Sequence, residues 1–135
     1  MSMRLERIKA RKVYNSRGEP TVEVDAWVSG CLGRAAAPAG KSKGGKEVMY
    51  YPEGGVDESI RLINGELAEK LVGVDASDHK NVDDVLKKFD GTEDFRRIGG
   101  NAAFAVSLAT AIAAANAQGK SLYEHLKEST IFRCS

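Results

Sequence analysis

The sequence predicts an α+β domain in which a three-stranded antiparallel β-meander is followed by a helical bundle. Three observations lead to this prediction: period-two alternation of apolar and polar residues in the first third, short connections there, and helical spacing of apolar residues afterwards. The 135 residues are 42% apolar and 29% charged, a composition that can form a packed core. The length excludes an eight-stranded α/β barrel, which needs about 250 residues.

The strands are expected before residue 38. The clearest signal is residues 22–28, where Val and Ala alternate with Glu, Asp and Trp, as in a half-buried strand. A similar run covers residues 8–14, and the turn residues of 15–20 separate the two. A third short strand is expected over residues 31–37, stopping at Pro38. Connections this short favour antiparallel pairing, because a parallel crossover needs a dozen or more residues.

Helices are expected after a long loop at residues 38–55. Apolar residues at 56, 60, 63, 67 and 71 form one stripe that Gly73 ends. A second helix covers residues 82–89, with Asn81 as its possible N-cap and Gly91 at its end. The third, residues 101–118, is alanine-rich and uncharged, which is typical of a buried helix. A short helix over residues 122–126 would follow.

Composition narrows the class of protein. A net charge of +1 and a pI near 7.8 do not indicate a nucleic-acid or anionic-membrane partner. Cys31 and Cys134 lie far apart, so neither a zinc site nor a disulfide framework is indicated. Residues 1–14 lack the apolar core of a signal peptide, and residues 101–119 are expected to be too short and too weakly apolar to span a bilayer. We therefore expect a cytoplasmic protein with no membrane partner.

The segment with the clearest chemical character is the loop around Gly40, Lys41, Ser42 and Lys43. Residues 40–46 match the first seven positions of a phosphate-binding P-loop, G-x-x-x-x-G-K. The match fails at Glu47, where a magnesium-binding hydroxyl is needed, and no helix begins there. Two interpretations remain: a positively charged flap that closes over an anionic small molecule, or a solvated surface loop.

Other candidate residues are weaker. His79 and His125 are expected to be exposed and without a partner carboxylate at the spacing of metal ligands, and the neighbouring Asp83 and Asp84 are interpreted as part of a helix amino end. No Ser-His-Asp or Cys-His set is apparent in the sequence.

Several blocks, in the expected order and covering nearly the whole chain to residue 126, resemble the enolase family. Residues 10–24 (ARKVYNSRGEPTVEV) are similar to its DSRGNPTVEVE-type opening, and residues 33–42 (GRAAAPAGKS) to its GRA-x-VPSGAS segment. The remaining matches are FDGT at 89–92, GGNA at 99–102, VSLA at 106–109 and LY at 122–123.

The resemblance implies that residues 1–126 form an amino-terminal capping domain and that residues 127–135 are a non-matching tail. The family dehydrates 2-phosphoglycerate to phosphoenolpyruvate in glycolysis with two magnesium ions, and its catalytic base and metal carboxylates lie in a carboxy-terminal barrel. No catalytic residue is then expected in this chain, and the isolated chain is expected to be inactive. The loop of Gly40, Lys41, Ser42 and Lys43 would close over the substrate, with Ser42 as a ligand of the second magnesium only when a barrel is present.

The resemblance also implies that Arg11 and Glu23 form ion pairs across a dimer interface; ordinary outward-facing strand charges are the alternative. Asn15 and Glu19 depart from the family's usual Asp and Asn, and the loop lysines replace smaller residues, so a divergent, archaeal-type member is indicated. The alternative function is a stand-alone assembly module that docks on a separately encoded barrel or on a second copy of itself.

Overall fold

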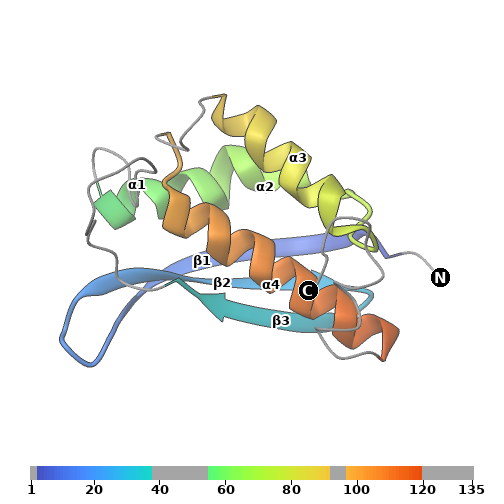
Figure 1. The fold of residues 1–135 in the computed structure, drawn as a ribbon, viewed down its shortest axis with the longest axis horizontal. Coiled ribbons are helices and arrows are strands. Elements are labelled where there is room, and N and C mark those ends of the chain that lie inside the picture. Colours follow the sequence, from blue (N-terminus) through green and yellow to red (C-terminus); the bar gives the residue numbers. More distant parts are fainter. Residues whose placement is uncertain (1–2, 38–54, 92–96, 120–135) are drawn as a thin grey trace, which may run out of the picture.

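The computed structural model describes residues 3–37, 55–91 and 97–119 and has two layers, a sheet and helices that cover one of its faces (Figure 1). The α+β prediction is confirmed. In chain order the elements are β1 (Leu5–Tyr14), β2 (Pro20–Val28), β3 (Cys31–Ala36), α1 (Gly55–Leu62), the π-helical turn η1 (Ile63–Leu67), α2 (Ala68–Leu71), α3 (His79–Asp90) and α4 (Gly100–Gln118).

The sheet is the predicted antiparallel meander, with strand order β1-β2-β3. Ser29 and Gly30 join β2 to β3, and both have positive φ, +50° and +78°. Two successive left-handed residues make the kind of tight turn whose twist matches that of the strands it joins. The alternating valines of β2 are fully buried and face the helices.

The turn between β1 and β2 is built around Asn15. Its Oδ1 accepts hydrogen bonds from the backbone N–H groups of Arg17 and Glu19, both at 2.9 Å, and its Nδ2 donates to Glu19 Oε1 at 2.9 Å. Gly18 supplies the positive φ of +77° that the turn needs. The two departures from the enolase pattern therefore contact each other. One side chain is an amide and the other a carboxylate, as in the family pattern, but they have exchanged places.

The single helix expected over residues 56–71 is divided by a π-helical turn. α1 runs into η1, which continues into α2 and ends before Gly73, whose φ is +95°. A π-turn adds one residue to the repeat and so shifts the buried face. As a result, Leu62 is buried beside Ile63, whereas Ile60 of the predicted stripe is only partly buried.

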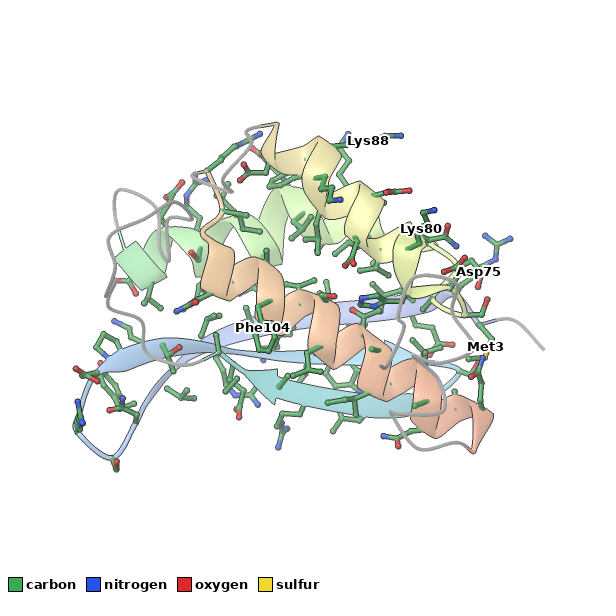
Figure 2. All side chains as sticks on the ribbon, in the orientation of Figure 1. Met3, Asp75, Lys80, Lys88 and Phe104 are labelled. Atoms are coloured by element: carbon green, nitrogen blue, oxygen red, sulfur yellow. The ribbon has the colours of Figure 1, made fainter. Side chains whose placement is uncertain are left out.

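The free edge of β1 is covered by the chain that follows α2. Leu5 N–H donates to Val74 O at 2.9 Å, Gly73 N–H donates to Leu5 O at 2.8 Å, and Ala76 N–H donates to Met3 O at 2.8 Å. Figure 2 shows Met3 and Asp75 at this end of the molecule. Such cover protects an edge strand from pairing with other chains.

The predicted N-cap of α3 is wrong. The helix begins at His79, three residues before its first buried valine, and Asp78 is its cap, accepting a hydrogen bond from Lys80 N–H at 3.0 Å. Asn81 lies in the first turn and donates instead to Asp75 O at 3.0 Å. The predicted end is confirmed, because Gly91 has a left-handed φ of +74° and its N–H donates to Lys87 O. Lys80 and Lys88 point away from the sheet (Figure 2).

α4 is the central helix and lies across β2 and β3 (Figure 1). Its bounds agree with the predicted residues 101–118, and Gly119 ends it. Most of its alanines are buried, so the helix backbone approaches the sheet closely. A Cβ added to Gly33 of β3 would lie 2.2 Å from Ala109 O and 2.3 Å from Ala113 N. Gly33 is therefore required by the packing.

Among the described residues, α4 is the helix that is long and apolar enough to cross a membrane by length and composition, with 19 residues and a mean hydropathy of 1.3. The expectation that this segment is too short and too weakly apolar was wrong. The fold provides another reason for its composition, because 61% of the apolar window is buried against the rest of the domain. A buried core helix passes the same test of length and composition as a membrane span.

We predict that Gly33→Ala lowers the free energy of unfolding by more than about 3 kcal/mol, because the new methyl group would meet helix backbone and could be accommodated only by separating α4 from the sheet. Urea unfolding monitored by circular dichroism measures the change. Gly65→Ala is the matched control: nothing lies within 4 Å of its added Cβ, so stability should be unchanged or slightly higher. Equal stabilities for the two variants would contradict the packing argument.

Candidate functional site

The predicted substrate loop, with Gly40, Lys41, Ser42 and Lys43, lies outside the described residues, as do Lys46, Tyr50 and Tyr51. The structure does describe the residues on either side of it. Ala37, directly after β3, is held by the start of β2: Thr21 Oγ1 donates to Ala37 O at 2.7 Å, and Ala37 N–H donates to Val22 O at 3.1 Å. Thr21 is buried, so this anchor is shielded from water.

The other end of the loop is tied to the same place in the sheet. Gly55 opens α1 with a φ of +72°, and Asp57 in its first turn pairs with Lys12 Nζ of β1 at 3.1 Å. Lys12 lies directly opposite Val22 in the β1–β2 register. Both ends of the segment therefore join the rigid sheet at one cross-strand pair. Binding residues are often placed on a loop presented in this way by a rigid scaffold.

The sheet face opposite the helices carries a ladder of charges, which consists of Arg11, Glu23, Asp25 and Arg34. Arg11 lies opposite Glu23 in the register, with Nη2 2.7 Å from Glu23 Oε1, and its Nη1 donates to Asp25 Oδ2 at 3.0 Å. Arg34 donates to both Asp25 oxygens, at 2.7 and 3.1 Å. Asp25 is thus held between two guanidinium groups and is only 4% exposed.

The two predicted interface residues, Arg11 and Glu23, are therefore brought together and pair within the chain. Their side chains remain 34% and 24% exposed, so each still presents polar atoms to the surface. Their predicted role between subunits stays a prediction. Asp25 was not among the predicted site residues. The signal that could have identified it is its position between two arginine-bearing strands.

The arginines change the acidity of Asp25. Hydrogen bonds from Arg34 and Arg11 outweigh the cost of burial and lower the pKa of Asp25 from 3.8 to about 2. The carboxylate is consequently charged at any physiological pH, and the ladder stays intact. Its role is electrostatic and structural, because a carboxyl with so low a pKa is a poor general base near neutrality.

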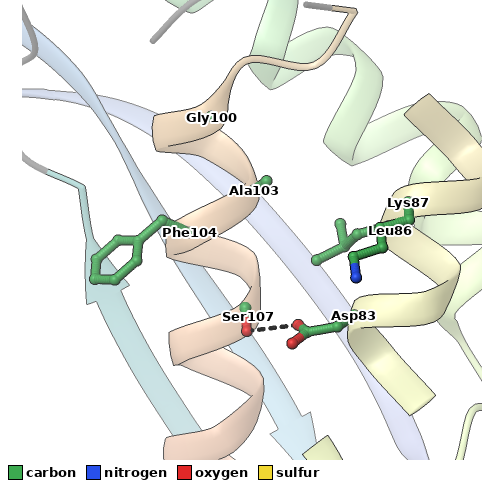
Figure 3. Close-up of a pocket in the computed structure, with 7 residues that line it drawn as sticks. All are labelled: Asp83, Leu86, Lys87, Gly100, Ala103, Phe104 and Ser107. Atoms are coloured by element: carbon green, nitrogen blue, oxygen red, sulfur yellow. Dashed lines mark hydrogen bonds between the residues drawn. The ribbon is translucent and has the colours of Figure 1, made fainter. Parts of the chain in front are cut away.

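A second polar cluster joins α3 to α4 and was not predicted. His79 Nε2 lies 3.1 Å from Asp83 Oδ2, and Ser107 Oγ donates to Asp83 Oδ1 at 2.9 Å (Figure 3). The expectation that His79 is exposed is wrong, because this cluster leaves it half-buried. The spacing of four residues on one helix, which places two side chains on the same face, was the signal available in the sequence.

This cluster is not a nucleophilic triad. In a triad the serine and the carboxylate contact opposite ring nitrogens of the histidine. Here Ser107 Oγ, at 3.5 Å, and Asp83 both approach His79 Nε2, and the serine already donates its proton to the carboxylate. The arrangement holds a serine in place and does not activate it.

The cluster shifts both acidities. The hydrogen bond to Asp83 outweighs burial and raises the pKa of His79 above 6.5. Burial alone would raise the pKa of Asp83, but the hydrogen bonds from His79 and Ser107 and the positive charges of His79 and Lys87 leave it below 3.8. Each shift favours the charged form of its side chain.

A pocket of about 350 Å³ opens beside this cluster, between α3 and the first half of α4 (Figure 3). Leu86, Ala103 and the half-exposed Phe104 make its lining mainly apolar, and Asp83 and Lys87 add charge. The carboxylate of Asp83 and the hydroxyl of Ser107 are hydrogen-bonded to each other. The pocket therefore offers apolar contact and no evident catalytic group.

No group of three or more His, Cys, Asp or Glu side chains that could hold a metal ion occurs within residues 3–37, 55–91 and 97–119. Ser42, the predicted magnesium ligand, lies outside these residues. One family block has a clear structural role. Asp90 Oδ1 of the FDGT block accepts from Ile98 N–H at 2.8 Å, and buried Ser59 donates to Ile98 O at 2.7 Å, which fixes the entry to α4.

Comparison with known proteins agrees with these features. The family model described as "Enolase, N-terminal domain" matches residues 5–126. The enolase of Methanothermobacter thermautotrophicus is 48% identical over 90% of this chain and 29% of its own length, and that of Methanosphaera stadtmanae is 46% identical over 90% and 30%. The enolase of Methanothrix thermoacetophila is 41% identical over 93% of this chain and 32% of its own. The chain therefore spans about a third of the length of the curated relatives it matches.

We predict that acid selectively removes the contribution of Asp25 to stability. The lowered pKa means that this contribution is fully present above 3.8 and is lost as the pH falls toward about 2. The expected loss is about 1–2 kcal/mol, because one pKa unit corresponds to about 1.4 kcal/mol and the partly exposed arginines are screened. Urea unfolding of the wild type and Asp25→Asn should show their difference shrinking across this window. Glu69→Gln, at an exposed position, is the control; a difference independent of pH would contradict the assignment.

We also predict that the pKa of His79 depends on Asp83. In the wild type the pKa lies above 6.5, so the His79–Asp83 pair stabilises the fold below pH 6.5 and this contribution is lost as the pH rises through the raised pKa. Asp83→Asn removes the largest cause, and burial should then lower the pKa below 6.5. An NMR titration of the imidazole signals measures both values, with His125, the other histidine in the sequence, as an internal reference. A pKa unchanged in Asp83→Asn would contradict the coupling.

Proposed function

The chain belongs to the enolase family, in which it corresponds to the amino-terminal domain, and from that premise we propose that it caps the active site of a magnesium-dependent hydro-lyase. The reaction would be the conversion of 2-phosphoglycerate to phosphoenolpyruvate in the cytoplasm. The observation that carries the proposal is the match over residues 5–126, in a chain whose sheet and helices have the expected order.

In this proposal the loop of Gly40, Lys41, Ser42 and Lys43 closes over the substrate. The anchors at Ala37 and Asp57 support it, since they attach both ends of the loop to one place in the sheet. Its lysines would attract the phosphate and carboxylate of the substrate, and closure would exclude water and strengthen those interactions. A serine hydroxyl is a hard oxygen ligand of the kind that magnesium accepts, which supports Ser42 as one of its ligands.

The proposal assigns the proton-transfer groups to a barrel domain, which residues 1–126 do not include. The relatives are about three times as long as the matched region, which supports a partner or further domain of that kind. We propose that the chain by itself is inactive. Arg11 and Glu23 would contact a second subunit through the surface atoms that their mutual ion pair leaves exposed.

The alternative, a stand-alone assembly module, uses the same fold without the chemistry. The charge ladder on the uncovered sheet face favours it, because Arg11, Glu23 and Arg34 all reach the surface there. Such a module would bind a barrel polypeptide, or a second copy of itself, whether or not Ser42 is present. The two functions therefore differ in their dependence on one hydroxyl.

We predict that the purified chain forms no phosphoenolpyruvate alone and that activity appears when it is mixed with the barrel portion of the Methanothermobacter thermautotrophicus enolase and magnesium. Ser42→Ala should lower the activity of the mixture at least ~10-fold through loss of a metal ligand. Ser77→Ala is the control, because that hydroxyl donates only to the nearby Asp75.

Two outcomes would decide against the capping function. Product formation by the chain alone would show that it has its own catalytic groups. A stable complex in sedimentation whose activity is absent, or is unaffected by Ser42→Ala, would favour the assembly module.

A further inference from the structure

Asn64, in the π-helical turn η1, fastens that turn to the edge of β1. Its Oδ1 accepts a hydrogen bond from Ala10 N–H at 2.7 Å, and its Nδ2 donates to Ala10 O at 3.0 Å. The backbone of Ala10 presents one donor and one acceptor, so the partner must supply one of each. A side-chain amide does this, whereas a carboxylate has acceptors only.

The residue after Asn64 is Gly65, and this is the one Asn–Gly pair in the sequence. An asparagine side chain can be attacked at Cγ by the backbone nitrogen of the next residue, and glycine hinders that attack least because it has no side chain. A bond forms between Gly65 N and Asn64 Cγ, the bond from Cγ to the amide nitrogen breaks, and ammonia leaves. Water then opens the cyclic imide at either carbonyl, giving aspartate or isoaspartate.

The folded structure opposes this reaction. The helical backbone on either side of Asn64 keeps the next backbone nitrogen in the helix ladder, away from the side-chain carbon. Both polar atoms of the side chain are also held by Ala10. Asn64 is nevertheless exposed to solvent. Water can therefore reach the cyclic imide once local opening of the turn allows it to form.

We propose that Asn64 is a conformationally gated deamidation site: the fold protects it while η1 is paired with β1, and local opening converts it irreversibly to a carboxylate. The product would place a carboxylate oxygen against Ala10 O, two acceptors with no proton between them, and the hydrogen bond from Nδ2 would be lost. The altered contact lies next to Arg11, so it would loosen the strand that carries the charge ladder. This inference does not rest on the proposed function.

The first test compares deamidation rates of the full chain at mildly alkaline pH in buffer and in concentrated urea, using peptide mass spectrometry. We expect conversion at Asn64 to be at least ~10-fold slower in buffer, because opening of a packed helical turn is infrequent. In urea, Asn64 should react faster than Asn15, Asn81, Asn101 and Asn116. Equal rates in the two conditions, or no preference for Asn64 in urea, would overturn the proposal.

Gly65→Ala separates the chemistry from the fold. Its added methyl group has open space in the folded chain, so the contact with Ala10 should persist. In urea the same methyl group should hinder the cyclisation and slow deamidation of Asn64 by at least ~10-fold, since the protection then cannot come from structure. An unchanged rate in urea would exclude attack by the residue 65 nitrogen.

Asn64→Asp reproduces one product directly. It should lower the urea midpoint and speed hydrogen exchange at the Ala10 amide. Asn116→Asp is the matched control, because Asn116 donates one hydrogen bond, to Leu32 O at 3.0 Å, from an exposed position. Equal effects of the two variants, or wild-type stability of Asn64→Asp, would contradict the structural consequence. If Asn64→Asp does not fold, the rate comparison still tests the gating.

Discussion

The close approach of α4 to the sheet at Gly33 is the constraint on which the rest of the structure depends. Helix backbone lies where a side chain at this position would be, so β3 must carry glycine and α4 must present small residues. This explains why a 19-residue helix is so rich in alanine and why it resembles a membrane span in composition. At this contact, stability comes from the close packing of small side chains over a wide area.

The opposite face of the same strands carries a buried carboxylate that two arginines pair with. The helices of the described residues cover one side of the sheet, and β2 nevertheless places Asp25 on the other side almost without exposure. Arg34, the residue after Gly33, covers it from β3, while Arg11 covers it from β1. Gly33 and Arg34, adjacent residues of one family block, thus act on the two faces of the sheet. Gly33 allows the close approach of α4, and Arg34 pairs with Asp25 on the other face.

Much of this fold could be predicted from the sequence, because strand alternation, helical stripes and glycine helix ends are local signals. The meander, the extent of α4 and the ends at Gly73 and Gly91 depend on such signals. The π-turn was missed because an extra residue in a helix changes the stripe only slightly, and Asp78 was missed because two capping residues compete within four positions. The contacts of Asn64 with Ala10, and of Ser107 with Asp83, join residues far apart in sequence, so no local pattern reveals them. The candidate loop could be located from sequence, yet its chemistry rests on family resemblance.

The two loop anchors have a consequence for how such a chain can vary. Because Ala37 and Asp57 are tied to opposite members of one cross-strand pair, the separation of the loop ends is set by the sheet and not by the loop's own residues. Loop-closure entropy depends only logarithmically on length, about 0.6 kcal/mol for each doubling. Insertions, deletions and changes of charge between the anchors therefore cost the domain little stability, so the fold places little restriction on the length and charge of this segment.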